Sequence, residues 1–254
     1  MNQAIRHGSS MIAESRRILV FTGAGLSTES GIPDFRSPGG LWDKYDPSDF
    51  YFDKFLASGE IRERYWRMSS EAYAVMRKAS PNKAHLALHL LEKAGKLLGL
   101  VTQNIDRLHH KAGNSPDIVL ELHGTTFFVS CLFCGASFER DEIEERRSAG
   151  ETAPRCKKCG GLLKPATVSF GQAMPQKAMS LALEWAAECD LCIVLGSSLV
   201  VYPAASVPIE AGRHGAPLII INRDETPMDD RAELVIHGSV TEILGPMVEA
   251  ALRT

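Results

Sequence analysis

Six short apolar runs recur along this chain of 254 residues, and each is continuous rather than alternating between apolar and polar positions. They are ILVF (18–21), LLGLV (97–101), IVLEL (118–122), LCIVL (191–195), PLIII (217–221) and, more weakly, ELVI (233–236). Continuous runs are typical of strands that helices cover on both faces. Helical patterns are predicted between several of them, at 3–15, 80–95, 176–188, 203–213 and 240–252. This alternation predicts an α/β fold with a doubly wound, parallel, Rossmann-like sheet.

The segment SPNKAHLALHLLEKAG (80–95) shows the helical pattern most clearly. Ser80 is suited to cap the helix and Pro81 to its first turn. Small and apolar residues then recur at helical spacing until Gly95, and they predict one buried face. These residues are Ala84, Ala87, Leu88, Leu91 and Ala94.

Polar residues follow five of the predicted strands. Because ligands of open α/β sheets bind at the carboxyl ends of the strands, we expect these five clusters to converge on one site. The clusters are Thr22-Gly23, Thr102-Gln103-Asn104, His123-Gly124, Gly196-Ser197-Ser198 and Asn222-Arg223-Asp224.

Two segments interrupt the alternation, and we assign both to a smaller domain inserted into the sheet domain. The segment 36–80 is rich in aromatic residues and helical in its later part, and 126–164 holds four cysteines. The large domain would then comprise 1–35, 81–125 and 165–254, with the ligand cleft between the two domains.

Composition narrows the class of protein. Hydrophobic residues make up 44% and charged residues 23%, as in ordinary globular proteins. The formal net charge of −3 gives no general attraction to nucleic acid or to anionic membranes. The first residues, MNQAIRHGSSMIAESRR, lack the apolar core of a signal peptide, and no run is long enough to cross a bilayer. We therefore expect a cytoplasmic protein with no membrane partner.

Two C-x-x-C knuckles, CLFCG (131–135) and CKKCGG (156–161), lie 21 residues apart. Four thiolates complete the tetrahedral coordination of zinc and leave no position for water, so this spacing predicts a structural rather than a catalytic ion. The predicted ligands are Cys131, Cys134, Cys156 and Cys159; the alternative is four reduced cysteines in a loop. A third pair, CDLC (189–192), runs into an apolar strand and is interpreted as buried core thiols.

The stretch ILVFTGAGLSTESGIPDFR (18–36) begins as a strand and breaks into a glycine-rich loop. Alone, its Gly23 and Gly25 could form a tight connection between a strand and a helix. Alone, His123 could be a hydrogen-bonded core histidine, and TQNIDRLHH (102–110) an ordinary turn. Their occurrence together, directly before the zinc knuckles, requires a common explanation.

Taken together, these motifs resemble the sirtuins, a family of NAD-dependent protein lysine deacylases. The resemblance covers nearly the whole chain, in the order of the family. It rests on GAGLSTESGIPDFR (23–36), TQNIDRLH (102–109), LHG (122–124), the two cysteine pairs, GSSLVVYPAA (196–205) and IINRDETPMDD (220–230).

The resemblance implies how NAD would be held. Backbone amides around Ala24 and Gly25 would bind the diphosphate, helped by the positive potential of a helix start. Phe35 would shield the glycosidic carbon, and Arg36 would face phosphate. The ribose hydroxyls and a water would contact Gln103 and Asn104, and the nicotinamide carboxamide would contact Asp106. The full set implied for NAD is Gly23, Ala24, Gly25, Asp34, Phe35, Arg36, Gln103, Asn104, Ile105, Asp106, Gly196, Ser197, Ser198, Asn222, Arg223, Asp224 and Val240.

The family chemistry implies that His123 and Asn104 are catalytic. The acyl-lysine oxygen would attack the ribose carbon as nicotinamide leaves, forming an alkylimidate. Neutral His123 would then accept a proton from a ribose hydroxyl, and free lysine and O-acyl-ADP-ribose would follow. An imidazole with a pKa of about 6.5 suits this role at neutral pH. We interpret His109 and His110 as structural or surface groups.

The acylated peptide is expected to bind as an added strand along ATVSFGQAMP (166–175), which resembles the substrate strand of the family. Val168 and Phe170 would line the acyl-lysine tunnel, and Gly171 would let the peptide backbone approach. Ala166-Thr167 and Gln172 depart from the family pattern, and Gln172 replaces a frequent glutamate that could anchor a basic peptide.

The acyl preference is read from RYWRMS (64–69). Relatives that remove succinyl groups carry Tyr-x-x-Arg, whereas Tyr65 is followed here by Met68, which cannot pair with a carboxylate. We therefore expect neutral acyl groups, with both residues as substrate contacts; the alternative is that both are simply core.

Two other functions remain open. The chain could transfer ADP-ribose to protein or water, or it could be a non-enzymatic zinc module that touches DNA. The second alternative is not favoured, because acidic DEIEE (141–145) lies beside the lysines of the knuckles. We expect a monomer that acts on acylated lysine peptides or proteins and does not bind nucleic acid directly.

Overall fold

A six-stranded parallel sheet forms the centre of the larger part of the molecule. The structure is a computed structural model and describes residues 3–34 and 44–253. The strand order is β3-β2-β1-β7-β8-β9, which confirms the predicted α/β class and all six predicted strands. They are β1 (Ile18–Thr22), β2 (Leu97–Thr102), β3 (Val119–Glu121), β7 (Leu191–Leu195), β8 (Leu218–Asn222) and β9 (Leu234–His237).

The order of the strands reverses between β1 and β7. From β1 the chain proceeds outward to β2 and β3, then returns to β7 on the other side of β1 and continues to β8 and β9. In open α/β sheets the ligand crevice opens at such a reversal, outside the carboxyl ends of the strands. The ends of β1 and β7, at Thr22 and Leu195, therefore mark the expected position of the cofactor.

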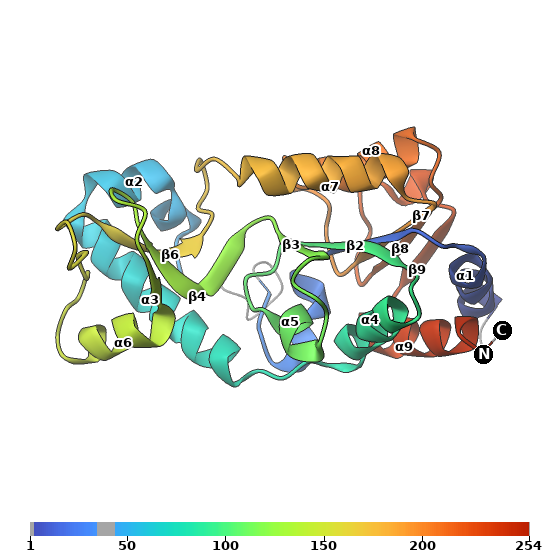
Figure 1. The fold of residues 1–254 in the computed structure, drawn as a ribbon, viewed down its shortest axis with the longest axis horizontal. Coiled ribbons are helices and arrows are strands. Elements are labelled where there is room, and N and C mark those ends of the chain that lie inside the picture. The colour runs from blue at the N-terminus through green and yellow to red at the C-terminus, as the bar shows by residue number, and fades with distance from the viewer. Residues whose placement is uncertain (1–2, 35–43, 254) are drawn as a thin grey trace.

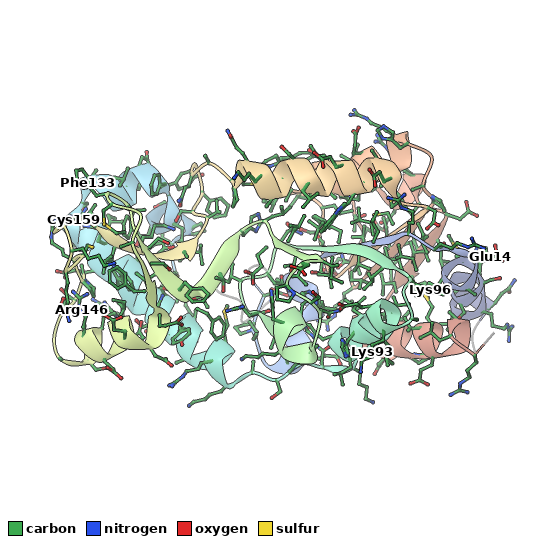
Figure 2. The ribbon with its side chains drawn as sticks, in the orientation of Figure 1. Glu14, Lys93, Lys96, Phe133, Arg146 and Cys159 are labelled. Atoms are coloured by element: carbon green, nitrogen blue, oxygen red, sulfur yellow. The ribbon has the colours of Figure 1, made fainter. Side chains whose placement is uncertain are left out.

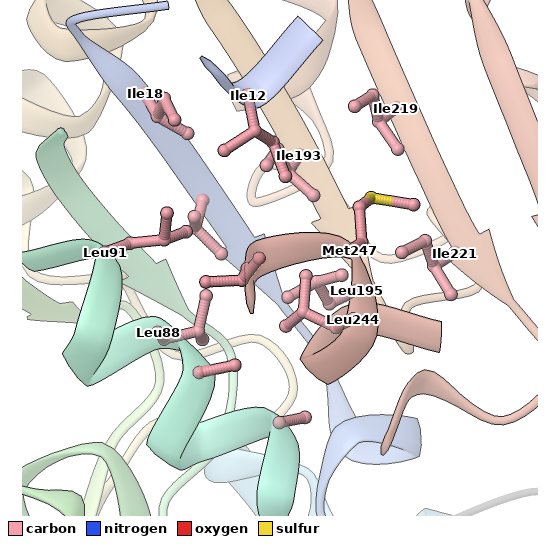
Figure 3. Close-up of a cluster of buried hydrophobic side chains, with 14 of the residues drawn as sticks. Ile12, Ile18, Leu88, Leu91, Ile193, Leu195, Ile219, Ile221, Leu244 and Met247 are labelled. Atoms are coloured by element: carbon pink, nitrogen blue, oxygen red, sulfur yellow. The ribbon is translucent and has the colours of Figure 1, made fainter. Parts of the chain in front are cut away.

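Helices cover both faces of this sheet, α7 and α8 on one side and α4 and α9 on the other (Figure 1). Successive residues of the buried strands alternate between the two layers, so that Ile18 and Val20 face one core while Leu19 and Phe21 face the other. Figure 3 shows the first of these cores, where Leu88, Leu244 and neighbouring side chains pack onto the strands. The helices are α1 (Gln3–Glu14), α4 (Lys83–Lys93), α5 (Leu108–Ala112), α7 (Gln176–Glu188), α8 (Ser206–Arg213) and α9 (Val240–Ala251).

The start of α4 differs from the prediction. Asn82, not Ser80, caps the helix, because its Oδ1 accepts hydrogen bonds from the amides of Ala84 and His85 at 3.0 and 3.3 Å. Asn82 also donates through Nδ2 to the carbonyl oxygen of Leu26 at 2.8 Å, which fixes the loop after β1 to this helix. A tertiary contact thus places the first turn two residues later than the local pattern indicates.

The other end of the molecule combines a small antiparallel sheet with helices (Figure 1). Its order is β5-β4-β6, and Trp66 of α3 packs with Val129, Ile143 and Leu163 in its core. The elements are η4 (Pro47–Phe50), α2 (Phe52–Ala57), α3 (Gly59–Lys78), β4 (Gly124–Cys131), β5 (Ser137–Glu139), α6 (Arg140–Ser148) and β6 (Leu163–Thr167). No helix among residues 3–34 and 44–253 is both long and apolar enough to span a membrane.

Candidate active site

Two glycine-containing loops meet where β1 and β7 end. The amide of Gly23 donates to the Leu195 carbonyl at 3.0 Å, and the amide of Gly25 donates to the Gly196 carbonyl at 2.9 Å. A Cβ atom on Gly23 would lie 2.7 Å from the Gly196 carbonyl oxygen, and one on Gly25 would lie 2.9 Å from the Gly196 Cα. Only glycine fits at these points, so the backbones of the two loops pack directly against each other.

The loop after Gly23 forms two short 3-10 turns, η1 (Ala24–Leu26) and η2 (Thr28–Ser30). The expected helix start is therefore wrong, because a single turn has no extended dipole to direct at an anion. The Gly25 amide is engaged with Gly196, whereas the Ala24 amide has no acceptor among the described residues. The Ala24 amide is thus the better placed of the two to meet a phosphate oxygen.

Hydrogen bonds connect four of the five predicted strand-end clusters. Gln103 Nε2 donates to Ser197 Oγ at 2.9 Å, and Asn104 Nδ2 donates to the Gly23 carbonyl at 3.1 Å. The Gln103 carbonyl lies 3.0 Å from His123 Nδ1. The fifth cluster follows the neighbouring strand, whose Ile221 carbonyl accepts from the Gly196 amide at 2.9 Å. The predicted convergence at one edge of the sheet is therefore present.

The contact with Gln103 determines which nitrogen of His123 can act as a base. A carbonyl oxygen only accepts hydrogen bonds, so Nδ1 must carry the proton, and the lone pair of the neutral ring lies on Nε2. Burial lowers the pKa of His123 below its usual value, although the bond to Gln103 acts in the opposite direction. The ring is accordingly neutral at pH 7 and able to accept a proton.

A buried carboxylate, that of Asp106, contacts the glycine-rich loop after β1. Asp106 Oδ2 accepts from Ser27 Oγ at 2.7 Å, and its Oδ1 accepts from the Leu108 amide at 2.9 Å. Burial raises the pKa of Asp106, and these two bonds partly offset the shift. Asn104 Nδ2 also donates to Ser27 Oγ, at 3.1 Å, so Ser27 joins two residues that the sequence singled out. Ser27 lies within the motif GAGLSTESGIPDFR, but the motif alone does not indicate this linking position.

The fifth strand-end cluster lies at the end of β8, near the start of α9. Asn222 is buried and donates through Nδ2 to the Asp224 carbonyl at 2.8 Å. Val240 is buried as the first residue of α9. Glu29 of the glycine loop accepts hydrogen bonds from the hydroxyls of Ser239 and Thr241. These contacts fix the loop on the helix beside which the adenosine is expected.

A polar network lies under the predicted substrate strand. The Tyr65 hydroxyl lies 3.2 Å from Thr167 Oγ1 and accepts from Ser169 Oγ at 3.4 Å. Lys164 is buried, with its ammonium 5.4 Å from the centre of the Tyr65 ring and donating to the Thr167 carbonyl. Tyr65 and Met68 are both buried on α3. The hydroxyl of Tyr65 is therefore engaged within the protein.

The four predicted zinc ligands form one cluster at the end of the molecule opposite α1. Their sulfur atoms all lie within 4.8 Å of one another, with Cys131 to Cys159 at 3.5 Å and Cys134 to Cys156 at 3.8 Å. Tetrahedral zinc with Zn–S bonds of about 2.3 Å needs sulfurs about 3.8 Å apart, so the cluster fits this ion. Figure 2 labels Cys159 beside Phe133 at this end, with Glu14 at the other. A Cβ on Gly161 would lie 2.7 Å from the Cβ of Phe133, which leaves no room for another residue there.

Comparison with known proteins identifies the family. The model of the Sir2 family matches residues 23–203. The chain belongs to the Sir2 family. An NAD-dependent protein deacetylase of Rhodopseudomonas palustris is 47% identical over 248 residues, covering 98% of this chain and 97% of the relative. An NAD-dependent protein deacylase of Archaeoglobus fulgidus is 42% identical over 256 residues, covering 100% of this chain and 98% of the relative. A solved Sir2 complex with a p53 peptide and NAD+ has a TM-score of 0.90 at 37% identity and covers 100% of both chains.

Not every residue expected in this Sir2 protein can be placed. Phe35 and Arg36 lie outside the described residues, and Asp34 is half-buried at the edge of them. Ile105 packs with Leu108 and Phe127 beside the site. The third cysteine pair is confirmed as core: Cys189 and Cys192 are buried, and burial raises the pKa of Cys189 to about 11.

Proposed function

We propose that this protein is an NAD-dependent protein lysine deacylase that releases nicotinamide, free lysine and O-acyl-ADP-ribose. The observation that carries the proposal is the hydrogen bond from His123 Nδ1 to the Gln103 carbonyl, which leaves the lone pair of the neutral ring on Nε2. The names and bound peptides of the relatives support the same activity.

In this reaction the acyl-lysine oxygen attacks the ribose carbon of NAD, and nicotinamide leaves. His123 Nε2 would take the proton of a ribose hydroxyl, whose oxygen attacks the resulting imidate carbon. A water would then add to this carbon, and its bond to the lysine nitrogen would break to release free lysine and O-acyl-ADP-ribose. Positioned proton transfer of this kind is typically worth about 10² to 10⁴ in rate. Asn104 and Gln103 would hold the ribose, since both present amide groups at the same strand end. Asp106 would accept from the carboxamide of nicotinamide.

The acyl group is proposed to be neutral. Met68 offers no partner for a carboxylate, and the Tyr65 hydroxyl is engaged by Thr167 and Ser169. The Lys164 ammonium is buried and donates to the Pro165 and Thr167 carbonyls. Among these described residues, a succinyl carboxylate would therefore lose its water without gaining a free cationic partner.

We further propose that Cys131, Cys134, Cys156 and Cys159 hold one structural zinc ion. The ion would stabilise the small sheet and take no part in the reaction, because four thiolates leave no open coordination position. None of the six cysteines forms a disulfide bond, which supports a reducing, cytoplasmic location. We also propose that the protein is a monomer, and gel filtration tests this.

Mass spectrometry of an acyl-lysine peptide series with NAD tests the proposed function. The series contains acetyl, butyryl, myristoyl, lipoyl and succinyl peptides, and O-acyl-ADP-ribose is expected from the neutral members. His123→Ala should abolish the product, whereas His214→Ala, at an exposed histidine after α8, should not. Nicotinamide release without any acyl product would instead favour ADP-ribosyl transfer or NAD hydrolysis.

A further inference from the structure

Backbone hydrogen bonds pair the substrate strand with a segment distant in the sequence. The Phe170 amide donates to the Phe50 carbonyl at 3.2 Å, and the Phe52 amide donates to the Phe170 carbonyl at 2.9 Å. Tyr51 and Phe170 therefore form an isolated parallel bridge. The entry into α2 is thus an integral part of the peptide-binding edge.

The side chains of this pair remain outside the core. Tyr51 is 47% exposed and Phe170 is 42% exposed, with ring centroids 5.8 Å apart. Nearby Phe55 is fully buried and packs edge-on against Tyr65 at 5.1 Å. Two adjacent exposed rings leave apolar surface that a ligand can cover.

The backbone amides of the substrate strand indicate where a peptide backbone can bind. Within 168–172, Gly171 has the one amide without an acceptor among the described residues. Gly171 has φ +75, and a Cβ there would meet only Tyr51 Cδ1, at 4.0 Å. The Tyr51 ring therefore lies next to the residue whose amide a peptide backbone can bind. The other amides of this segment bond to His123 O (from Val168), Gln172 Oε1 (from Ser169), Phe50 O (from Phe170) and Ser169 O (from Gln172).

The chemistry of this surface selects its occupant. None of Tyr51, Phe170, Gly171 and Gln172 carries a charge, and the Gln172 amide group is turned inward to Ser169. We infer that Tyr51 and Phe170 form a subsite for an apolar side chain, such as Leu, Met or Phe, next to the acyl-lysine. This inference rests on the proposed function and names the peptide class that the same site prefers.

Matched acetyl-lysine peptides test the subsite. The peptides carry Leu or Phe in place of Gly at each neighbouring position, and both their dissociation constants and their kcat/KM values are measured. One position should favour the apolar residue by about five- to tenfold, because an apolar side chain leaves water on binding. Tyr51→Ala should remove this preference through KM rather than kcat, and Tyr51→Phe should retain it. Leu86→Ala is the matched control, since Leu86 is 49% exposed on α4.

Peptide affinity, measured by fluorescence anisotropy, separates failure of the inference from failure of the proposed activity. If peptides bind with the Tyr51-dependent preference but none is turned over, the subsite stands and the deacylase activity does not. Equal affinity for apolar and glycine neighbours, or an unchanged preference in Tyr51→Ala of native melting temperature, would overturn the subsite.

Discussion

Replacing Gly196 by alanine tests whether close packing of the two glycine loops builds the NAD site. Gly196 has φ +59, and a Cβ there would lie 2.3 Å from Leu26 N and 2.5 Å from Gly25 C. Ordinary contact begins near 3.4 Å, so one loop must move by about 1 Å. Gly215 is the matched control, because it has φ +88 and a Cβ there would meet nothing within 4 Å.

The magnitudes follow from these two environments. The left-handed backbone costs a non-glycine residue about 1–2 kcal/mol, and this is the whole penalty expected for Gly215→Ala. Gly196→Ala adds about 1 kcal/mol for stretching the hydrogen bond from Gly25 to Gly196. We expect a total loss near 2–3 kcal/mol in the free energy of unfolding, measured by urea denaturation.

The two variants should differ more in kcat/KM than in their free energy of unfolding. A displacement of about 1 Å in a binding loop can cost on the order of 100-fold in rate. Gly196→Ala should therefore lower kcat/KM for NAD by about 10- to 100-fold, while Gly215→Ala should leave it unchanged. The reasoning fails if the two variants lose equal stability and Gly196→Ala retains its KM for NAD.

Three further predictions address other parts of the molecule. Because burial lowers the pKa of His123 from its usual value of about 6.5 and the neutral ring is the base, kcat/KM should rise with pH through an inflection below 6.5; an inflection above this value contradicts the reasoning. Cys131→Ser should lower the zinc content measured by mass spectrometry and Cys189→Ser should not; equal zinc in both would refute the assigned ligands. Lys96→Met should cost about 1–2 kcal/mol in urea denaturation with activity unchanged, because Lys96 Nζ donates to the carbonyls of Ile12, Ala13 and Ser15 at the C-terminal end of α1; native stability would exclude this capping role.

The half of the site that would hold NAD could be predicted from the sequence because its signals are local. Each buried strand is visible in the sequence as an apolar run, and polar residues follow it directly. Gln103, Asn104 and Ser197 could therefore be placed at the carboxyl edge of the sheet. The cysteine pairs are equally local, and the burial of Cys189 shows why the third pair needed its strand context. The start of α4 was missed because Asn82 is also held by Leu26, a partner far away in the sequence.

The part of the site that would bind the acylated peptide is different. Its geometry depends on contacts between residues far apart in the sequence, which local sequence patterns do not indicate. Tyr51 meets Phe170, and Tyr65 meets Thr167 and Ser169, across more than 100 residues. None of these contacts changes an apolar run or a turn signal in the sequence. The sequence therefore indicated the substrate strand but not the residues that pack against it. The same separation allows the two halves to vary independently. Side-chain substitutions at 51, 65, 167 or 169 can change the peptide or acyl group while the backbone bonds of Gly23, Gly196 and Val168 and the bond between His123 and Gln103 remain. We therefore expect the specificity of this protein to be decided on the segments from the small sheet and helices, and its chemistry on the strand ends.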